Sequence, residues 1–135
     1  MHLMRAAVVL FIALIFATPA LADPLAAPIL NPSDRTVWAY EGLYQVENAI
    51  DYGQTLDIKR HPNVVESNPF LGRHPSDAAI FRLKAADALG HAAITAVLLR
   101  LHAPRPALFI WELATIGSQG VGLINNYGLG LRVRF

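Results

Sequence analysis

Two pairs of side chains stand at helical spacings that suit acid–base or metal chemistry. Asp87 and His91 are four residues apart, so on a helix they share one face and the carboxylate could orient or charge the imidazole. Glu47 and Asp51 have the same spacing, and two such carboxylates repel unless one is protonated or a cation lies between them. We therefore take Asp51, Asp87, His91 and Glu112 as candidate catalytic residues, and Glu47, Asp51, His91 and Glu112 as candidate metal ligands.

A structural interpretation of the same polar groups is the simpler one. Carboxylates, a histidine and Gln119 on apolar helices can satisfy one another's hydrogen bonds and fix the helix register. The chain has no His-Glu-x-x-His spacing, no Gly-x-Ser-x-Gly turn and no phosphate-binding glycine loop before Lys-Ser or Lys-Thr. We therefore expect a protein that is not an enzyme and has no organic cofactor, with a divalent metal as the open alternative.

Composition excludes several classes of protein. The 135 residues include no cysteine, which removes disulfides, thiolate nucleophiles and Cys-ligated zinc. A net charge of +1 argues against a nucleic-acid partner, because binding phosphates needs a concentrated excess of Lys and Arg. Only 16% of the residues are charged and 54% are hydrophobic, so disorder is excluded and a membrane environment becomes a candidate.

The N-terminal segment has the pattern of a secretory signal peptide. Arg5 precedes an unbroken apolar run over residues 6–17, and Ala20-Leu21-Ala22 fits the small-x-small cleavage rule. We expect a signal peptide over 1–22, a proline-rich leader over 23–33, a helical domain over 34–127 and a C-terminal tail over 128–135.

The elements that must position the polar groups are three helices. The first runs from Asp34, after an N-cap at Ser33, to about Ile58, with polar groups on one side and apolar groups on the other. Ser76 caps a second helix that ends near Leu101, and a third follows from Ala107 to about Asn125. The predicted fold is an all-α, membrane-associated three-helix bundle.

The second and third helices favour a lipid environment over a soluble core. Their basic residues lie near the helix ends, where long side chains can reach the membrane surface. Both carry small residues four apart, which permit close helix packing; these are Ala88, Ala92, Ala96 and Ala114, Ser118, Gly122. Helix one is the weak point, because its acidic residues would be costly at the bilayer centre.

Charge distribution sets the expected orientation. An exported N-terminus sends helix one inward, so the loop after it and the C-terminus face the cytoplasm. The cytoplasmic basic residues would be Lys59, Arg60, Arg73, Arg82, Lys84, Arg132 and Arg134, against Arg35, Arg100 and Arg105 outside. We therefore expect the inner membrane, with lipid and either another membrane protein or a second copy as partners.

The C-terminal tail alternates apolar and other residues from Tyr127 to Phe135. This resembles the last strand of bacterial outer-membrane β-barrels, but residues 34–125 have helical periodicity and lack the repeated strands of a barrel. The alternatives are a short strand or an extended basic segment near lipid headgroups.

The loop carries a motif with a family resemblance. Asn68-Pro69 should start a turn, Gly72 can take a positive φ, and Glu66 could reach back to a helix end. With Asp51 and Thr55 on helix one, the loop resembles small bacterial multi-helix membrane proteins of unknown function that share Asp-x-x-x-Thr and Glu-x-Asn-Pro-x-Leu-Gly. That resemblance implies that Asp51, Thr55, Glu66, Asn68, Pro69 and Gly72 are signature positions; it adds no mechanism.

The leading hypothesis is a non-enzymatic inner-membrane helical protein that serves as an accessory or interaction subunit. The first alternative is a membrane-embedded enzyme, or a metal-handling or proton-handling site, built on the carboxylates and the histidine. The second is a soluble periplasmic helical binding protein.

Overall fold

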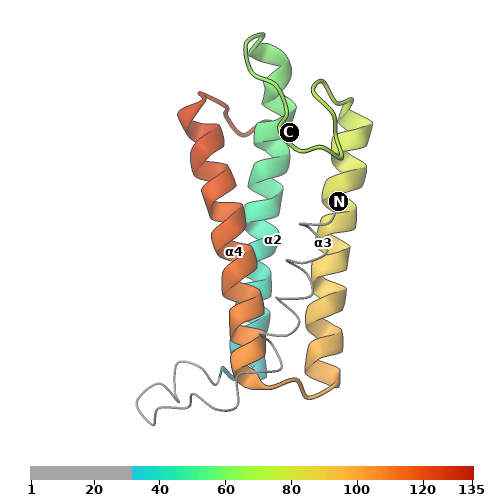
Figure 1. The fold of residues 1–135 in the computed structure, drawn as a ribbon, viewed down its shortest axis with the longest axis vertical. Helices are drawn as coiled ribbons and strands as arrows, with labels where there is room; N and C mark the ends of the chain where they lie inside the picture. Colours follow the sequence, from blue (N-terminus) through green and yellow to red (C-terminus); the bar gives the residue numbers. More distant parts are fainter. Residues whose placement is uncertain (1–31) are drawn as a thin grey trace, which may run out of the picture.

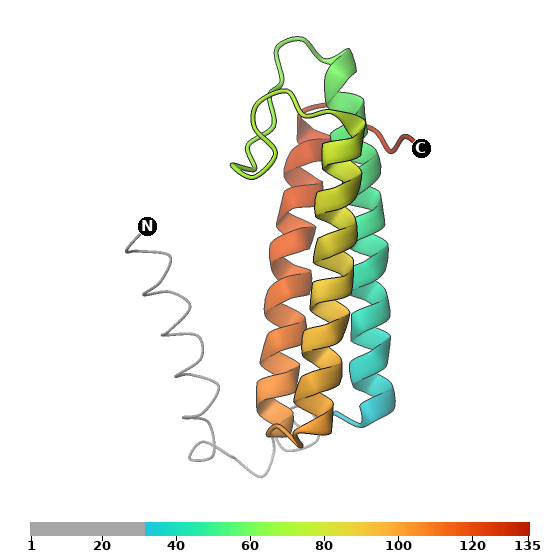
Figure 2. The ribbon, with the colours of Figure 1, turned by 90° about the vertical axis from the view of Figure 1, so that its right-hand side faces the viewer.

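Three helices of equal length form an elongated bundle (Figures 1 and 2). The computed structural model describes residues 32–135, so the expected signal peptide and most of the proline-rich leader lie outside the described residues. The helices are α2 (Asp34–Asp57), α3 (Asp77–Arg100) and α4 (Arg105–Gly128), and a short 3-10 turn, η2 (Ile58–Arg60), extends α2. The predicted all-α three-helix fold is confirmed.

Local sequence signals account for the helix starts. The side-chain oxygens of Ser33 and Ser76 accept hydrogen bonds from the backbone N–H groups of Thr36 and Ala79, which satisfies free donors at the first turns of α2 and α3. Pro106 lies in the first turn of α4, where its missing N–H costs nothing. Helix α4 extends three residues beyond the predicted Asn125, to Gly128, before the chain turns.

Helix α2 is the central element of the bundle. It packs along both α3 and α4, whereas α3 and α4 contact each other much less (Figure 1). The long loop after η2 and the C-terminal tail lie at one end, and the short α3–α4 connection lies at the other. Side chains on the inner face of α2 are therefore the ones that can reach both neighbours.

The distribution of polarity is inverted relative to a water-soluble bundle. Buried polar residues outnumber the large apolar ones inside, and they include Glu41, Asn48, Gln54, Thr55, Asp57, His91, Thr95 and Glu112. Large apolar side chains point outward on all three helices; Val46 is 57% exposed, Leu89 73% and Ile124 72%. The predicted polar side of helix one is thus its inner side.

One helix among residues 32–135, α4, is long and apolar enough to cross a membrane, and most of its apolar stretch is not covered by the rest of the bundle. A single helix of this kind is weak evidence for a membrane protein. Helix α3, which we expected to be equally suited, does not reach this criterion.

The C-terminal tail forms no strand; residues 131–135 have no regular structure. Gly130 has a positive φ of 86°, and the tail then crosses α2, where the Arg134 N–H donates to the Gly53 carbonyl oxygen at 3.1 Å. The strand alternative was wrong because the alternating residues meet a helix, which offers no ladder of strand partners.

Candidate functional site

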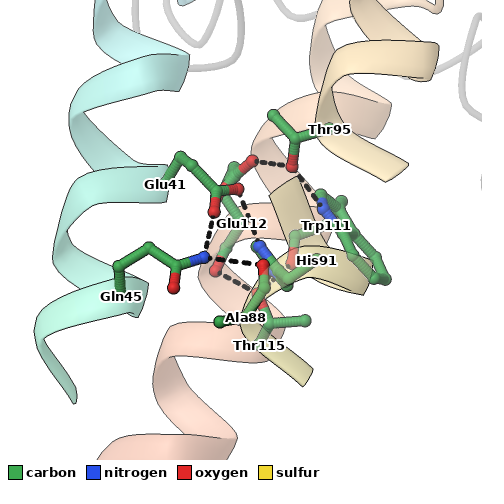
Figure 3. A network of polar contacts seen from close by, with 8 residues as sticks. All are labelled: Glu41, Gln45, Ala88, His91, Thr95, Trp111, Glu112 and Thr115. Atoms are coloured by element: carbon green, nitrogen blue, oxygen red, sulfur yellow. Dashed lines mark hydrogen bonds and ion pairs between the residues drawn. The ribbon is translucent and has the colours of Figure 1, made fainter. Parts of the chain in front are cut away.

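Each helix contributes one potential metal ligand to a buried cluster in the bundle (Figure 3). Glu41 comes from α2, His91 from α3 and Glu112 from α4; one ligand atom from each lies within 4.8 Å of the other two. All three residues are buried, and Glu112 is fully inaccessible. We call this set the central cluster.

The hydrogen bonds of His91 define its ring nitrogens. Nε2 is 2.8 Å from the Thr115 hydroxyl oxygen, and that hydroxyl donates its single proton to the backbone oxygens of Trp111 and Glu112. Since the Thr115 proton is already used, Nε2 carries a proton and donates it. Nδ1 lies 2.8 Å from Glu41 Oε2, and one proton is shared between these two atoms.

Two aromatic rings fix the plane of the imidazole. The Tyr44 ring stacks on the His91 ring with 3.7 Å between the ring centroids. The Trp111 ring also stacks on His91, with 4.7 Å between centroids. The imidazole can therefore turn little about its χ angles, and Nδ1 stays directed at Glu41.

Both carboxylates are oriented by neighbouring side chains. Gln45 Nε2 donates to Glu41 Oε1 at 2.5 Å and to the Ala88 carbonyl oxygen at 3.0 Å, which joins α2 to α3. The Thr95 hydroxyl donates to Glu112 Oε1 at 2.8 Å and accepts from Trp111 Nε1 at 3.0 Å (Figure 3).

The other carboxylate oxygen of Glu112, Oε2, is buried and has no hydrogen-bond partner among the described residues. No lysine or arginine in that part of the chain forms an ion pair with Glu41 or Glu112, although other acidic residues do have such partners. The central cluster thus holds two carboxyl groups in a confined space with unused acceptor capacity.

The structure brings two of the predicted candidates, His91 and Glu112, into the central cluster. Asp51 instead forms an ion pair with Lys84 and accepts from Asn126 Nδ2 at 2.8 Å, so the cation beside this carboxylate is a lysine. Asp87 is exposed and hydrogen-bonds the Tyr44 hydroxyl.

Glu47 lies against α4 at Gly120, away from His91. Its Oε2 atom is buried and has no hydrogen-bond partner in the described part of the chain, and the same holds for the Gln119 Nε2 atom on α4. Neither residue belongs to the three-ligand set.

Sequence reasoning missed Glu41 as a ligand candidate. Its only signal was its position on the polar side of helix one, in register with Asn48 and other inward residues. Pairing it with His91 requires the relative rotation of α2 and α3, which the spacing within one helix does not contain.

The loop motif makes local contacts. Glu66 Oε1 accepts from the Asn68 N–H at 2.7 Å, and Asn68 Oδ1 accepts from the Phe70 N–H at 3.0 Å. The predicted turn at Asn68 and the positive φ of Gly72, 72°, are confirmed, but Glu66 does not reach a helix end, because the loop donor two residues ahead of it is closer.

A second buried carboxylate, Asp57, joins the end of α2 to the C-terminal tail. The Arg132 backbone N–H donates to its Oδ2 at 2.9 Å, Arg134 Nε donates to its Oδ1 at 3.2 Å, and His61 Nε2 lies 3.3 Å from Oδ2. The Arg132 N–H is the main reason that the pKa of this carboxyl lies below its usual value; Arg134 and His61 add to the effect, and burial opposes it. We call this arrangement the tail clamp.

Comparisons with known protein families, with curated proteins and with solved structures found no match.

Proposed function

We propose that this chain is a small integral protein of the inner membrane and acts as an accessory or interaction subunit. The observation that carries the proposal is the inverted polarity of the bundle, with carboxyl, amide, hydroxyl and imidazole groups inside and large apolar side chains outside. In water this arrangement would be unfavourable, because apolar surface would stay hydrated while polar groups lost water. In lipid the apolar side chains face hydrocarbon, and the polar groups find their hydrogen-bond partners inside the bundle, so the same arrangement is favourable.

Helix α2 illustrates why a bilayer suits the bundle. Its acidic residues would be costly if they faced lipid alone, and in the bundle Glu41 meets His91 while Asp51 meets Lys84. Its outward side carries Leu43 and Val46. This supports insertion of α2 together with its two neighbours, with its polar side covered.

The ends of the bundle support the orientation with the loop in the cytoplasm. The loop and the C-terminal tail lie at the same end (Figure 2). Lys59, Arg60, Arg73, Arg132 and Arg134 belong to that end, whereas Arg100 and Arg105 flank the α3–α4 connection at the opposite end. The larger basic group at the loop end agrees with the positive-inside rule.

The interaction role is supported by small residues that the bundle leaves uncovered. Ala96, Ala114 and Ser118 are exposed, so these members of the two small-residue series do not mediate packing between α3 and α4. Small residues on a lipid-facing surface allow close approach of a helix from outside. A second copy or another membrane protein would supply that helix.

The absence of cysteine from the chain permits a direct test by single-cysteine labelling. Leu89→Cys and Ile124→Cys place thiols on the outward faces of α3 and α4, and Val65→Cys, in the loop, is the matched exposed control. We expect the protein to stay in membranes through alkaline carbonate extraction. A water-soluble maleimide should label position 65 at least about tenfold faster than positions 89 and 124, since lipid excludes it.

Release by carbonate together with equal labelling of all three positions would refute membrane insertion and favour the soluble periplasmic alternative. N-terminal sequencing of the isolated protein tests the signal peptide separately; we expect the mature chain to begin at Asp23. Labelling of the Val65→Cys thiol from the cytoplasmic side only would support the proposed orientation.

A further inference from the structure

We infer that Glu41, His91 and Glu112 form a binding site for a divalent transition-metal ion of the Zn²⁺, Fe²⁺ or Mn²⁺ class. The inference goes beyond the proposed membrane role and depends on different observations, namely the positions and contacts of these three side chains. It holds for a bundle in lipid or in water.

The geometry of the three ligand atoms is close to that of a metal site. In a tetrahedral zinc site with bonds of about 2.0–2.1 Å, the ligand atoms lie about 3.4 Å apart. Those of the central cluster lie within 4.8 Å of one another, and His91 Nδ1 is already 2.8 Å from Glu41 Oε2. The ligand atoms would have to approach one another by no more than about 1.4 Å to reach this spacing.

Charge supports a dication rather than a purely hydrogen-bonded cluster. Two carboxyl groups share this space. Among residues 32–135, no lysine or arginine forms an ion pair with either of them, and His91 is the basic residue that contacts Glu41. Glu112 Oε2 is fully buried, and residues 32–135 offer it no donor. One dication would balance two carboxylates and coordinate the unused oxygen, where a water could supply only a hydrogen bond.

The donor types select the class of metal. Carboxylate oxygens suit Mg²⁺, Ca²⁺ and Mn²⁺, and imidazole nitrogen suits Zn²⁺ and Fe²⁺, so a set of two carboxylates and one imidazole fits Zn²⁺, Fe²⁺ or Mn²⁺. The absence of cysteine removes the thiolates that soft ions such as Cu⁺ prefer. Three protein ligands also leave at least one coordination position for water or another small ligand.

Neighbouring residues supply the outer hydrogen bonds that metal ligands need. Thr115 accepts the Nε2 proton of His91 and thereby leaves Nδ1 as the ligand atom, while Gln45 and Thr95 hold one oxygen of Glu41 and of Glu112. A hollow of about 240 Å³, lined in part by Asp87, Gly90 and Trp111, reaches His91 from the surface. Solvent therefore approaches one of the three ligands, and an ion would enter past the His91 ring.

The experiment uses the full chain purified in detergent, stripped with a chelator and then supplied with zinc chloride. Wild-type protein should retain one Zn²⁺ per chain through desalting, measured by plasma mass spectrometry. Glu112→Gln and Glu41→Gln, which keep side-chain volume but remove a ligand charge, should each weaken Zn²⁺ binding by about 100-fold or more. Glu47→Gln is the matched control, because it makes the same change at a half-buried glutamate that has one buried oxygen and lies outside the cluster, and it should bind as the wild type does.

Cobalt gives a signal that would not appear if the central cluster had only a structural role. Co²⁺ bound by the central cluster should show visible absorption bands of a low-coordinate site, and these should be missing from His91→Asn. Helix content by circular dichroism identifies any variant that fails to fold, and Glu41→Gln and Glu112→Gln give independent tests if one of them does. No Zn²⁺ retention by the wild type, or equal retention by a folded Glu112→Gln protein, would overturn the inference and leave a hydrogen-bonded cluster; neither result bears on carbonate extraction, which tests membrane insertion.

Discussion

The bundle contains two buried carboxylate centres of opposite character. In the tail clamp, both oxygens of Asp57 accept from donors whose positions the backbone and Arg134 fix. In the central cluster, Glu112 has a buried oxygen with no donor among residues 32–135, and Glu41 is paired with a histidine in place of a lysine or arginine. The comparison separates a carboxylate whose bonding is complete, which suits a structural role, from carboxylates that retain capacity for a ligand.

The strongest test of the comparison is the loss of His91. His91→Ala removes the partner of Glu41 and the ring that stacks against Tyr44 and Trp111. Because a buried charge is then left unpaired, we expect the free energy of unfolding of the metal-free protein in detergent to fall by about 3–5 kcal/mol. Thermal and denaturant unfolding measure it. A loss below about 1 kcal/mol would show that the central cluster does not hold the helices together.

Much of the fold can be predicted from local sequence, as the helix starts show. Ser33 and Ser76 accept from backbone N–H groups three residues away, so their capping roles can be predicted without any tertiary information. The polar side of α2 can also be predicted from local sequence, because its polar residues recur with the period of an α-helix.

The site itself depends on how helices turn toward one another. Asp87 and His91 share a face of one helix, yet His91 Nδ1 is directed at Glu41, fifty residues earlier, and Asp87 contacts Tyr44. The tail is a similar case, because its alternation of residues contains no information that Asp57 and Gly53 on α2 would be its partners. These contacts depend on interhelical rotation and on loop length, which no spacing within a single helix encodes.

The second largest effect should come from the tail clamp. Asp57→Ala leaves the Arg132 N–H and the Arg134 guanidinium without their acceptor, so we expect a loss of about 1.5–3 kcal/mol in unfolding free energy. The tail should also become a substrate for carboxypeptidase, and the release of Phe135 measures this digestion. Asp34→Ala is the control: Asp34 pairs with Arg105 at an exposed position, and its loss should cost under about 1 kcal/mol. Equal effects of the two variants would contradict the clamp.

Close packing of the tail on α2 gives a smaller effect with a matched control. A Cβ atom at Gly53 would lie 2.7 Å from Val133 Cγ1 and 2.8 Å from the Arg134 carbonyl oxygen, so Gly53→Ala must displace the tail. We expect a net loss of about 1 kcal/mol, because strain of 1–3 kcal/mol exceeds the gain in helix propensity. Gly42→Ala, on the same helix with no atom within 4 Å, should instead stabilise the protein by about 0.5–1 kcal/mol. The same sign for both would show that the tail is not packed there.

Acid should release the tail clamp over a defined pH window. Since the pKa of Asp57 is lower in the folded protein, its contribution to stability is fully present above the unfolded value of about 3.9 and is lost as pH falls through the folded pKa. A fluorophore on Phe135→Cys should therefore report a fixed tail above about pH 4 and a tail that becomes mobile only as the pH falls further, through the folded pKa. The tail of an Asp57→Asn protein should show no such transition; an identical transition in that variant would assign it to another group.

The smallest expected change comes from exchanging carboxylate for amide in each centre. In Glu112→Gln the amide oxygen can still accept from Thr95, and the buried oxygen that lacks a donor is exchanged for an amide group of similar size. We therefore expect the metal-free protein to change in unfolding free energy by less than about 1 kcal/mol. Asp57→Asn should cost more, because an amide nitrogen then meets a backbone N–H or a guanidinium, and two donors cannot bond each other. If Glu112→Gln costs as much as Asp57→Asn in the absence of metal, both oxygens of Glu112 already have strong partners, and the distinction between a completed centre and one with free capacity fails.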